Sequence, residues 1–161
     1  MRIYNLSKRV RDDVGKEVEA ICPNLGLKLK NLRIAELDDQ DLAIVFETEE
    51  KLYLGRMKGT LYFPLLKDGI LLPKLPSATV DMGAVKFVIN GANVMRPGIV
   101  SFAGDFKKGN LLVIREISHQ KALAVGRSME GITTLEAMKK GVAVENLHYV
   151  GDKFWEALKS I

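Results

Sequence analysis

The stretch GANVMRPG, which begins at Gly91, combines residues that suit contact with a polyanion. At Gly91 and at the pair Pro97–Gly98 the backbone can approach a ligand closely and offer its N–H groups to phosphate, because no bulky Cβ intervenes. Lys86, shortly before, and Arg96, within the stretch, could each contact a phosphate. The same residues also suit a helix end, a turn and solvated charges, so the residues alone leave both interpretations open.

Further side chains could extend this candidate site. A basic track could continue at Arg127, in the run AVGRSM, and at the pair Lys139–Lys140. Lysines in the last turn of a helix also interact favourably with the helix dipole, so this pair suits a structural role as well. Met95 suits either an apolar contact with a sugar or base edge or a place in the core. The candidate binding residues are therefore Lys86, Gly91, Ala92, Asn93, Met95, Arg96, Pro97, Gly98, Arg127, Lys139 and Lys140.

Signatures of catalysis and of metal binding are missing from the sequence. It contains no GxxxxGK[ST], GxGxxG, HExxH, GxSxG or CxxC pattern, and Cys22 has no histidine near it in sequence. His148 suits a hydrogen-bonded structural role, and the carboxylates in 38–41 suit a solvated turn rather than a cation site. We therefore expect no enzyme activity, no metal and no cofactor.

The composition describes an ordinary globular protein with a small positive excess. The 161 residues are 47% hydrophobic and 27% charged, and 24 basic against 20 acidic residues leave a net charge of +4, which permits a polyanionic partner without requiring one. A single cysteine favours an intracellular protein without disulfides. Because no apolar run has the length of a signal peptide or of a membrane span, we expect a soluble cytoplasmic protein with no membrane contact.

Two prolines in the segment LLPKLPS, residues 71–77, predict a boundary between two domains, 1–75 and 76–161. Residues 1–76 carry 13 basic and 12 acidic residues, whereas 77–161 carry 11 and 8, so most of the positive excess lies in the second half.

The first half has the pattern of one helix followed by a meander of strands. Ser7 suits the N-cap of a helix that ends before Pro23 and whose apolar stripe is Val10, Val14, Val18 and Ile21. Alternating apolar residues then predict strands over 32–36, 42–46, 52–54 and 60–63, the first two joined by the turn at 38–41. This order indicates a small α+β domain.

The second half has the pattern of a small mixed β-barrel with helices at its ends. Asp81 suits the cap of a helix over 82–90, which Gly91 can end, and Thr133 with Glu136 forms a capping box for a helix over 135–140. Asp152 suits the cap of a terminal helix. The strands are expected over 99–102, 111–117, 122–125 and 142–150.

Three stretches of this half resemble the PUA domain, an RNA-binding module: DMGAVKFVINGANVMRPGIV at 81–100, ALAVGRSM at 122–129 and KKGVAVENLHYVGDKFW at 139–155. Within that superfamily the chain is most similar to the malignant T-cell amplified sequence family and its archaeal relatives, in which a small domain precedes the PUA domain. The resemblance is specific over about 85 residues and weaker over 1–76.

The resemblance implies an α+β chain with a C-terminal PUA-like pseudo-barrel and a noncatalytic, RNA-binding accessory role in translation. It implies contact with tRNA or ribosomal RNA at the groove between the first PUA helix and the following strand, association with the small ribosomal subunit, and a translation-factor partner protein. A ribosome-biogenesis factor and a targeting subunit of an RNA-modifying enzyme stay open as alternatives.

Overall fold

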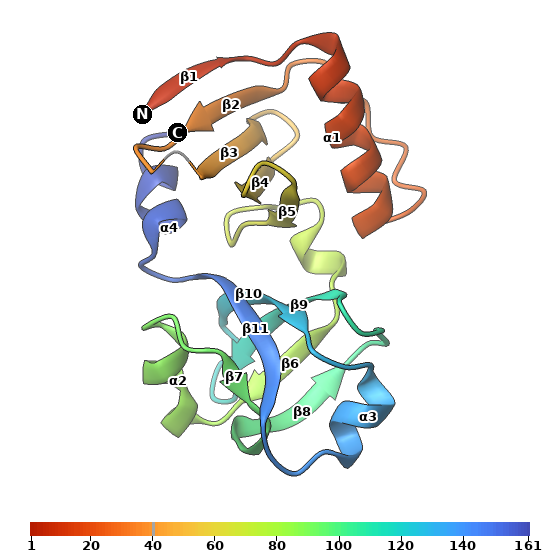
Figure 1. Cartoon of the computed structure of the whole chain (residues 1–161), viewed down its shortest axis with the longest axis vertical. Coiled ribbons are helices and arrows are strands. Elements are labelled where there is room, and N and C mark those ends of the chain that lie inside the picture. Colours follow the sequence, from red (N-terminus) through yellow and green to blue (C-terminus); the bar gives the residue numbers. More distant parts are fainter. Residues whose placement is uncertain (40) are drawn as a thin grey trace. The chain divides into compact units, whose positions relative to one another are not determined.

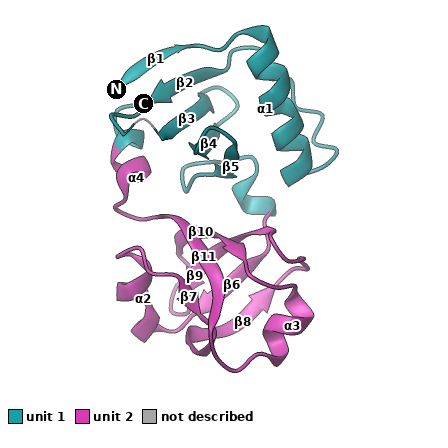
Figure 2. Ribbon diagram, viewed as in Figure 1, with its two compact units in different colours: residues 1–74, 157–161 teal, residues 75–156 magenta. Residues whose placement is uncertain are grey.

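The proline-rich segment divides the chain in the computed structural model, which describes residues 1–39 and 41–161 (Figure 2). One compact unit contains residues 1–74 and 157–161, and the other contains 75–156. The break after Lys74 lies one residue before the expected boundary. Residues 157–161, which the sequence placed in the second domain, group with the first unit, where Lys67 Nζ donates to the backbone carbonyl of Ile161 at 3.2 Å.

The first unit contains the helix α1, Lys8–Ile21, which lies beside the sheet (Figure 1). Ser7 caps it as predicted, because its Oγ accepts the backbone N–H of Val10 at 3.4 Å. Val14 and Val18 are buried in one cluster with apolar residues of the strands, so the predicted apolar stripe is the face that packs.

The sheet of the first unit has five antiparallel strands in the order β1-β2-β3-β4-β5, which confirms the predicted meander. Its first strand was not predicted, because it is short and mostly exposed and shows little apolar alternation. Gln40, part of the predicted turn, lies outside the described residues. The strands are β1 Arg2–Asn5, β2 Arg33–Glu36, β3 Leu42–Glu47, β4 Leu52–Met57 and β5 Leu61–Pro64.

A buried carboxylate organises the segment after β5. Asp68 Oδ1 accepts the backbone N–H of Tyr53 at 3.0 Å, and Oδ2 accepts those of Ile70, Leu71 and Leu72. Burial raises the pKa of the Asp68 carboxyl, and these N–H donors oppose the shift because they favour the charged form. The segment leads directly into the short 3-10 helix η1, Leu72–Lys74.

The sheet of the second unit has six strands in the order β7-β11-β10-β9-β6-β8, and it is mixed because β6 pairs in parallel with β9. Register shifts in β10 and β11 add the local bends that curl such a sheet. At the first of these, a Cβ on Gly126 would collide with the carbonyl of Glu145, so glycine allows β10 and β11 to approach. The strands are β6 Ser77–Val80, β7 Val94–Met95, β8 Ile99–Ala103, β9 Leu111–Glu116, β10 Ala122–Ser128 and β11 Val142–Tyr149.

Two of the three predicted helices in this half start where expected. Asp81 caps α2, Met82–Val88, by accepting the N–H of Ala84 at 2.9 Å. Asp152 caps α4, Lys153–Leu158, by accepting the N–H of Trp155 at 2.8 Å.

The predicted helix over 135–140 is wrong in position. The observed helix α3 is Ile132–Ala137, with Gly131 at its N-cap and no side-chain cap, so Thr133 and Glu136 form no capping box. The cause is tertiary: Ile132 N–H donates to the carbonyl of Phe106 at 3.1 Å, which fixes the chain one turn earlier.

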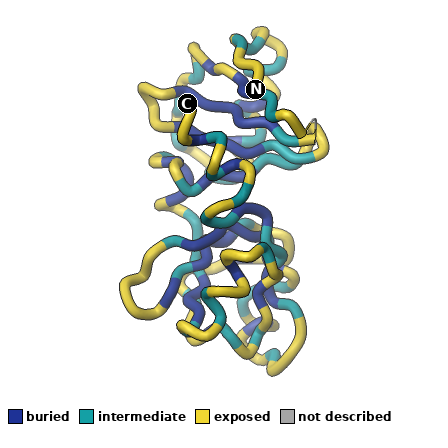
Figure 3. The backbone as a smooth tube through the Cα atoms, turned by 90° about the vertical axis from the view of Figure 1, so that its left-hand side faces the viewer, coloured by how far each residue is buried: buried dark blue, intermediate teal, exposed yellow. Residues whose placement is uncertain are grey.

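Buried backbone follows the strands of each unit, and exposed backbone follows the turns (Figure 3). His148 on β11 is fully buried, with Nδ1 2.9 Å from Asp152 Oδ2 and its ring edge-on to Phe154, in agreement with the predicted structural role. Among the helices of the described residues, none has the length and apolar character needed to cross a membrane.

Candidate nucleic-acid interface

A cavity of about 610 Å³ opens in the second unit between α2 and the segment that carries β7 and the 3-10 helix η2, Arg96–Gly98. Most of its lining is apolar, and among the lining residues Asp81 is the single ionisable one. The lining residues are Asp81, Gly83, Ala84, Phe87, Val88, Ala92, Asn93, Val94, Met95, Pro97, Gly98 and Val142.

Five of the predicted site residues meet at this cavity: Ala92, Asn93, Met95, Pro97 and Gly98. Ala92, Asn93, Met95 and Pro97 are exposed, and Met95 shows 48% of its surface. A hollow therefore lies where the groove beside the first helix of this unit was expected, and five of the eleven predicted residues line it.

Gly91 lies at the entrance to the loop that lines the cavity, in the left-handed conformation that the sequence predicted. Its φ is +91°, and its N–H donates to the carbonyl of Val88 at 3.0 Å. A side chain at this φ is strained. Gly91 thus ends α2 and turns the chain toward the cavity wall.

Phe87 is the strongest feature that the sequence analysis missed. It projects from α2 with 58% of its surface exposed and lines the cavity. The signal was available, since an aromatic residue off the buried stripe of an amphipathic helix is exposed. Lys86 Nζ lies 5.2 Å from the centre of the Phe87 ring, so a cation stands beside the aromatic face.

Asn146, on β11, holds the loop of the cavity and was also missed. Its Nδ2 donates to the carbonyls of Val88 and Ala92, each at 3.0 Å. Its backbone N–H donates to Asn93 Oδ1 at 3.0 Å. These three bonds fix residues 88–93 to the sheet, which positions the cavity wall.

Arg96 performs a structural task here. Its Nε donates to the carbonyl of Leu135 at 2.6 Å, its Nη1 donates to that of Ile99 at 2.9 Å, and its guanidinium lies over the ring of Phe102. The side chain thus ties η2 to α3 and β8, and two of its five N–H donors are occupied by backbone carbonyls.

The remaining predicted cations do not line the cavity. Arg127 on β10 forms an ion pair with Glu145 on β11 at 2.7 Å, so its charge is balanced locally. Lys139 and Lys140 are exposed and lie after the end of α3, not in its last turn as the sequence suggested. Lys86 does not line the cavity either, but its Nζ contacts Phe87, which does.

The sequence of this unit matches a known family. Residues 76–150 match the PUA domain. An uncharacterized protein of Methanocaldococcus jannaschii is 36% identical over 158 residues, which cover 94% of this chain and 94% of that protein. Malignant T-cell-amplified sequence 1-B of Xenopus laevis is 33% identical over 123 residues, which cover 72% of this chain and 66% of that protein. The chain belongs to the PUA-domain family of these proteins.

Other relatives of this PUA-domain protein extend the comparison. Translation machinery-associated protein 20 of Saccharomyces cerevisiae is 33% identical over 127 residues, which cover 69% of this chain and 70% of that protein. The crystal structure of a hypothetical protein from Pyrococcus horikoshii has a TM-score of 0.78 at 26% identity and covers 97% of this chain and 99% of that chain. The resemblance found in the sequence is thereby confirmed for the family and the fold.

Proposed function

We propose that this PUA-domain protein is a noncatalytic RNA-binding factor of the translation apparatus, and that its second unit binds an unpaired nucleotide at the α2–β7 cavity. The observation that carries the proposal is the apolar cavity with the exposed ring of Phe87 at its edge.

The chemistry of the cavity favours an unpaired base over the backbone of a duplex. Sequence-tolerant binding of single strands relies on bases stacked against aromatic side chains, whereas duplex RNA is bound mainly through phosphates and 2′-hydroxyls. The lining offers Phe87 and Met95 as apolar surfaces and Asn93 as a polar group, but no cation. Lys86, whose Nζ lies 5.2 Å from the centre of the Phe87 ring, would contact the phosphate that follows a stacked base.

The relatives support the connection to translation. The yeast relative is named for its association with the translation machinery. We infer that the RNA partner of this chain is tRNA or small-subunit ribosomal RNA, and that the small ribosomal subunit is the particle on which it acts. An unpaired RNA end or loop is the element that the cavity would hold.

Substitution of Phe87 tests the site. Loss of one stacked base costs about 1–3 kcal/mol, so we expect Phe87→Ala to weaken the binding of single-stranded RNA by roughly 5- to 150-fold. Ile117→Ala is the matched control, because Ile117 is 47% exposed in the same unit and does not line the cavity. Fluorescence anisotropy with a labelled oligonucleotide gives both values. Equal affinities for the two variants, or equal binding of single strand and duplex, would contradict the proposal.

Two further measurements separate the proposed role from its alternatives. Sedimentation with mature small subunits supports a translation factor, whereas sedimentation only with precursor particles indicates ribosome biogenesis. Incubation with tRNA followed by nucleoside analysis tests for a modification activity, and any new modified base would disprove the noncatalytic role.

A further inference from the structure

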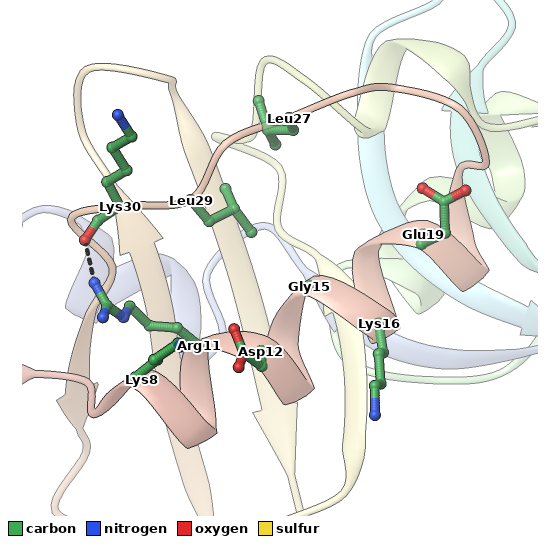
Figure 4. Close-up of a pocket in the computed structure, with 9 residues that line it drawn as sticks. All are labelled: Lys8, Arg11, Asp12, Gly15, Lys16, Glu19, Leu27, Leu29 and Lys30. Atoms are coloured by element: carbon green, nitrogen blue, oxygen red, sulfur yellow. Dashed lines mark hydrogen bonds between the residues drawn. The ribbon is translucent and has the colours of Figure 1, made fainter.

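A second cleft lies in the first unit, between α1 and the segment over 22–30 that follows it (Figure 4). Its volume is about 490 Å³. Arg11 Nη1 donates to the carbonyl of Lys30 at 2.6 Å, and this bond fixes the segment to the helix at one end of the cleft. The lining residues are Lys8, Arg11, Asp12, Gly15, Lys16, Glu19, Leu27, Leu29 and Lys30.

The charges around this cleft are mainly positive. Four cationic side chains and two carboxylates line it, which gives a net charge of +2. Glu19 Oε1 accepts the backbone N–H of Asn24 at 3.1 Å, so one of the carboxylates already has a donor. Lys8, Lys16 and Lys30 are exposed and, within the described part of the chain, form no ion pair shorter than 4.0 Å.

Three uncharged residues also line the cleft, Gly15, Leu27 and Leu29. Gly15 lies in the middle of α1, where glycine is the least favourable residue after proline. A Cβ built on Gly15 would have no atom of the chain within 4 Å, so internal packing does not require glycine here. Leu27 and Leu29 are half-buried and lie on the segment across from α1 (Figure 4).

We propose that this cleft binds the phosphate–ribose backbone of an RNA strand, as a contact separate from the α2–β7 cavity. Lys8 and Lys16 are eight residues apart on α1, about 12 Å along its axis, so the two side chains can contact different phosphates of one strand. The cations contact phosphates, and the leucines and Gly15 face the sugars. This inference takes from the proposed function only that the ligand is RNA.

Neutralisation of the three lysines tests the contact in the full chain. The probe is a labelled oligouridylate of about 12 nucleotides. Each phosphate contact with a single strand adds about 0.7 to the salt slope of binding, so Lys8→Gln, Lys16→Gln and Lys30→Gln together should lower the slope by about 2. The matched control replaces Arg9, Lys28 and Lys58 by Gln, since these are exposed cations of the same unit that do not line the cleft.

The outcomes distinguish this cleft from the α2–β7 cavity. Phe87→Ala should weaken binding without lowering the salt slope, so failure at one site leaves the other testable. If the lysine variant and its control have equal slopes, the proposal is wrong. In the unmodified chain, the NMR signals of the backbone amides of Gly15 and Leu29 should shift on titration with the oligouridylate. Unchanged signals would overturn the proposal even where the variant is poorly folded. Equal binding of an oligoglutamate would assign the cleft to an acidic peptide instead.

Discussion

The phenol of Tyr149 lies directly against the backbone of Gly91. A Cβ built on Gly91 would stand 3.0 Å from Tyr149 Oη and 3.1 Å from its Cε1 and Cζ, at a φ of +91°. The end of α2 and the strand β11 are therefore in close contact at a point where glycine satisfies both the backbone conformation and the space. This contact sets the distance between the sheet and the loop that lines the cavity.

Gly91→Ala should destabilise the protein and distort the candidate site. A left-handed conformation costs a residue with a Cβ about 1–2 kcal/mol, and the contact with Tyr149 adds to this cost. Urea unfolding measures the loss. Gly109→Ala is the control, because Gly109 also has a positive φ, +85°, but a Cβ there would meet no atom within 4 Å. Equal losses for both variants would show that the Tyr149 contact contributes nothing.

Asn146→Ala should lower RNA affinity although Asn146 does not line the cavity. The substitution removes the two bonds to the carbonyls of Val88 and Ala92. The bond to Val88 is partly buried, and a buried group left without a partner costs about 1–3 kcal/mol, whereas the carbonyl of Ala92 is exposed and can bind water instead. Asn146→Asp should be worse than Asn146→Ala, because a carboxylate would face two carbonyl oxygens. Calorimetric unfolding and RNA titration of both variants check this order, and an aspartate variant as stable as the unmodified protein would refute it.

Arg96→Lys should reduce stability while leaving the salt dependence of RNA binding unchanged. A lysine cannot reproduce the paired bonds from Nε and Nη1, and a hydrogen bond from a charged group contributes about 1.5–3 kcal/mol. Lys86→Gln is the contrasting variant, since removal of one phosphate contact lowers the salt slope by about 0.7 for a single strand. A lower slope for Arg96→Lys, with stability intact, would restore Arg96 as a phosphate contact.

The sequence predicted those features whose cause is local. Ser7, Asp81 and Asp152 cap the helices that follow them, because a cap bonds to N–H groups within three residues. The alternating strands of the first unit were likewise recognised from their own residues. In contrast, β6 and β7 were missed, because β6 has only four residues and is held by pairing with the distant strands β8 and β9, and β7 has only two residues.

The candidate site shows the same division between local and distant causes. The turn at Gly91 could be found from glycine alone, whereas the groove near Pro97 was expected from the resemblance to the PUA domain. The bonds of Asn146 join residues 53 to 58 positions apart, and Arg96 reaches a carbonyl 39 positions away. No local pattern indicates such partners, which is why Asn146 was missed and the structural role of Arg96 was not foreseen.

The turn between β9 and β10 should stabilise the protein, and this stabilisation should be lost in acid. Glu116 accepts the hydroxyl of Ser118 at 2.7 Å and the backbone N–H groups of His119 and Lys121, and these bonds, the Ser118 hydroxyl foremost, lower the pKa of its carboxyl. Because the folded state favours the ionised form, this stabilisation is complete above the ordinary pKa of 4.5 and is lost as pH falls through the lowered value. Glu116→Gln should therefore flatten the decline in urea midpoint in acid, whereas Glu136→Gln, at an exposed position of α3, should leave it unchanged. If the urea midpoints of the Glu116→Gln variant and of the unmodified protein decline in parallel as pH falls, this turn makes no contribution.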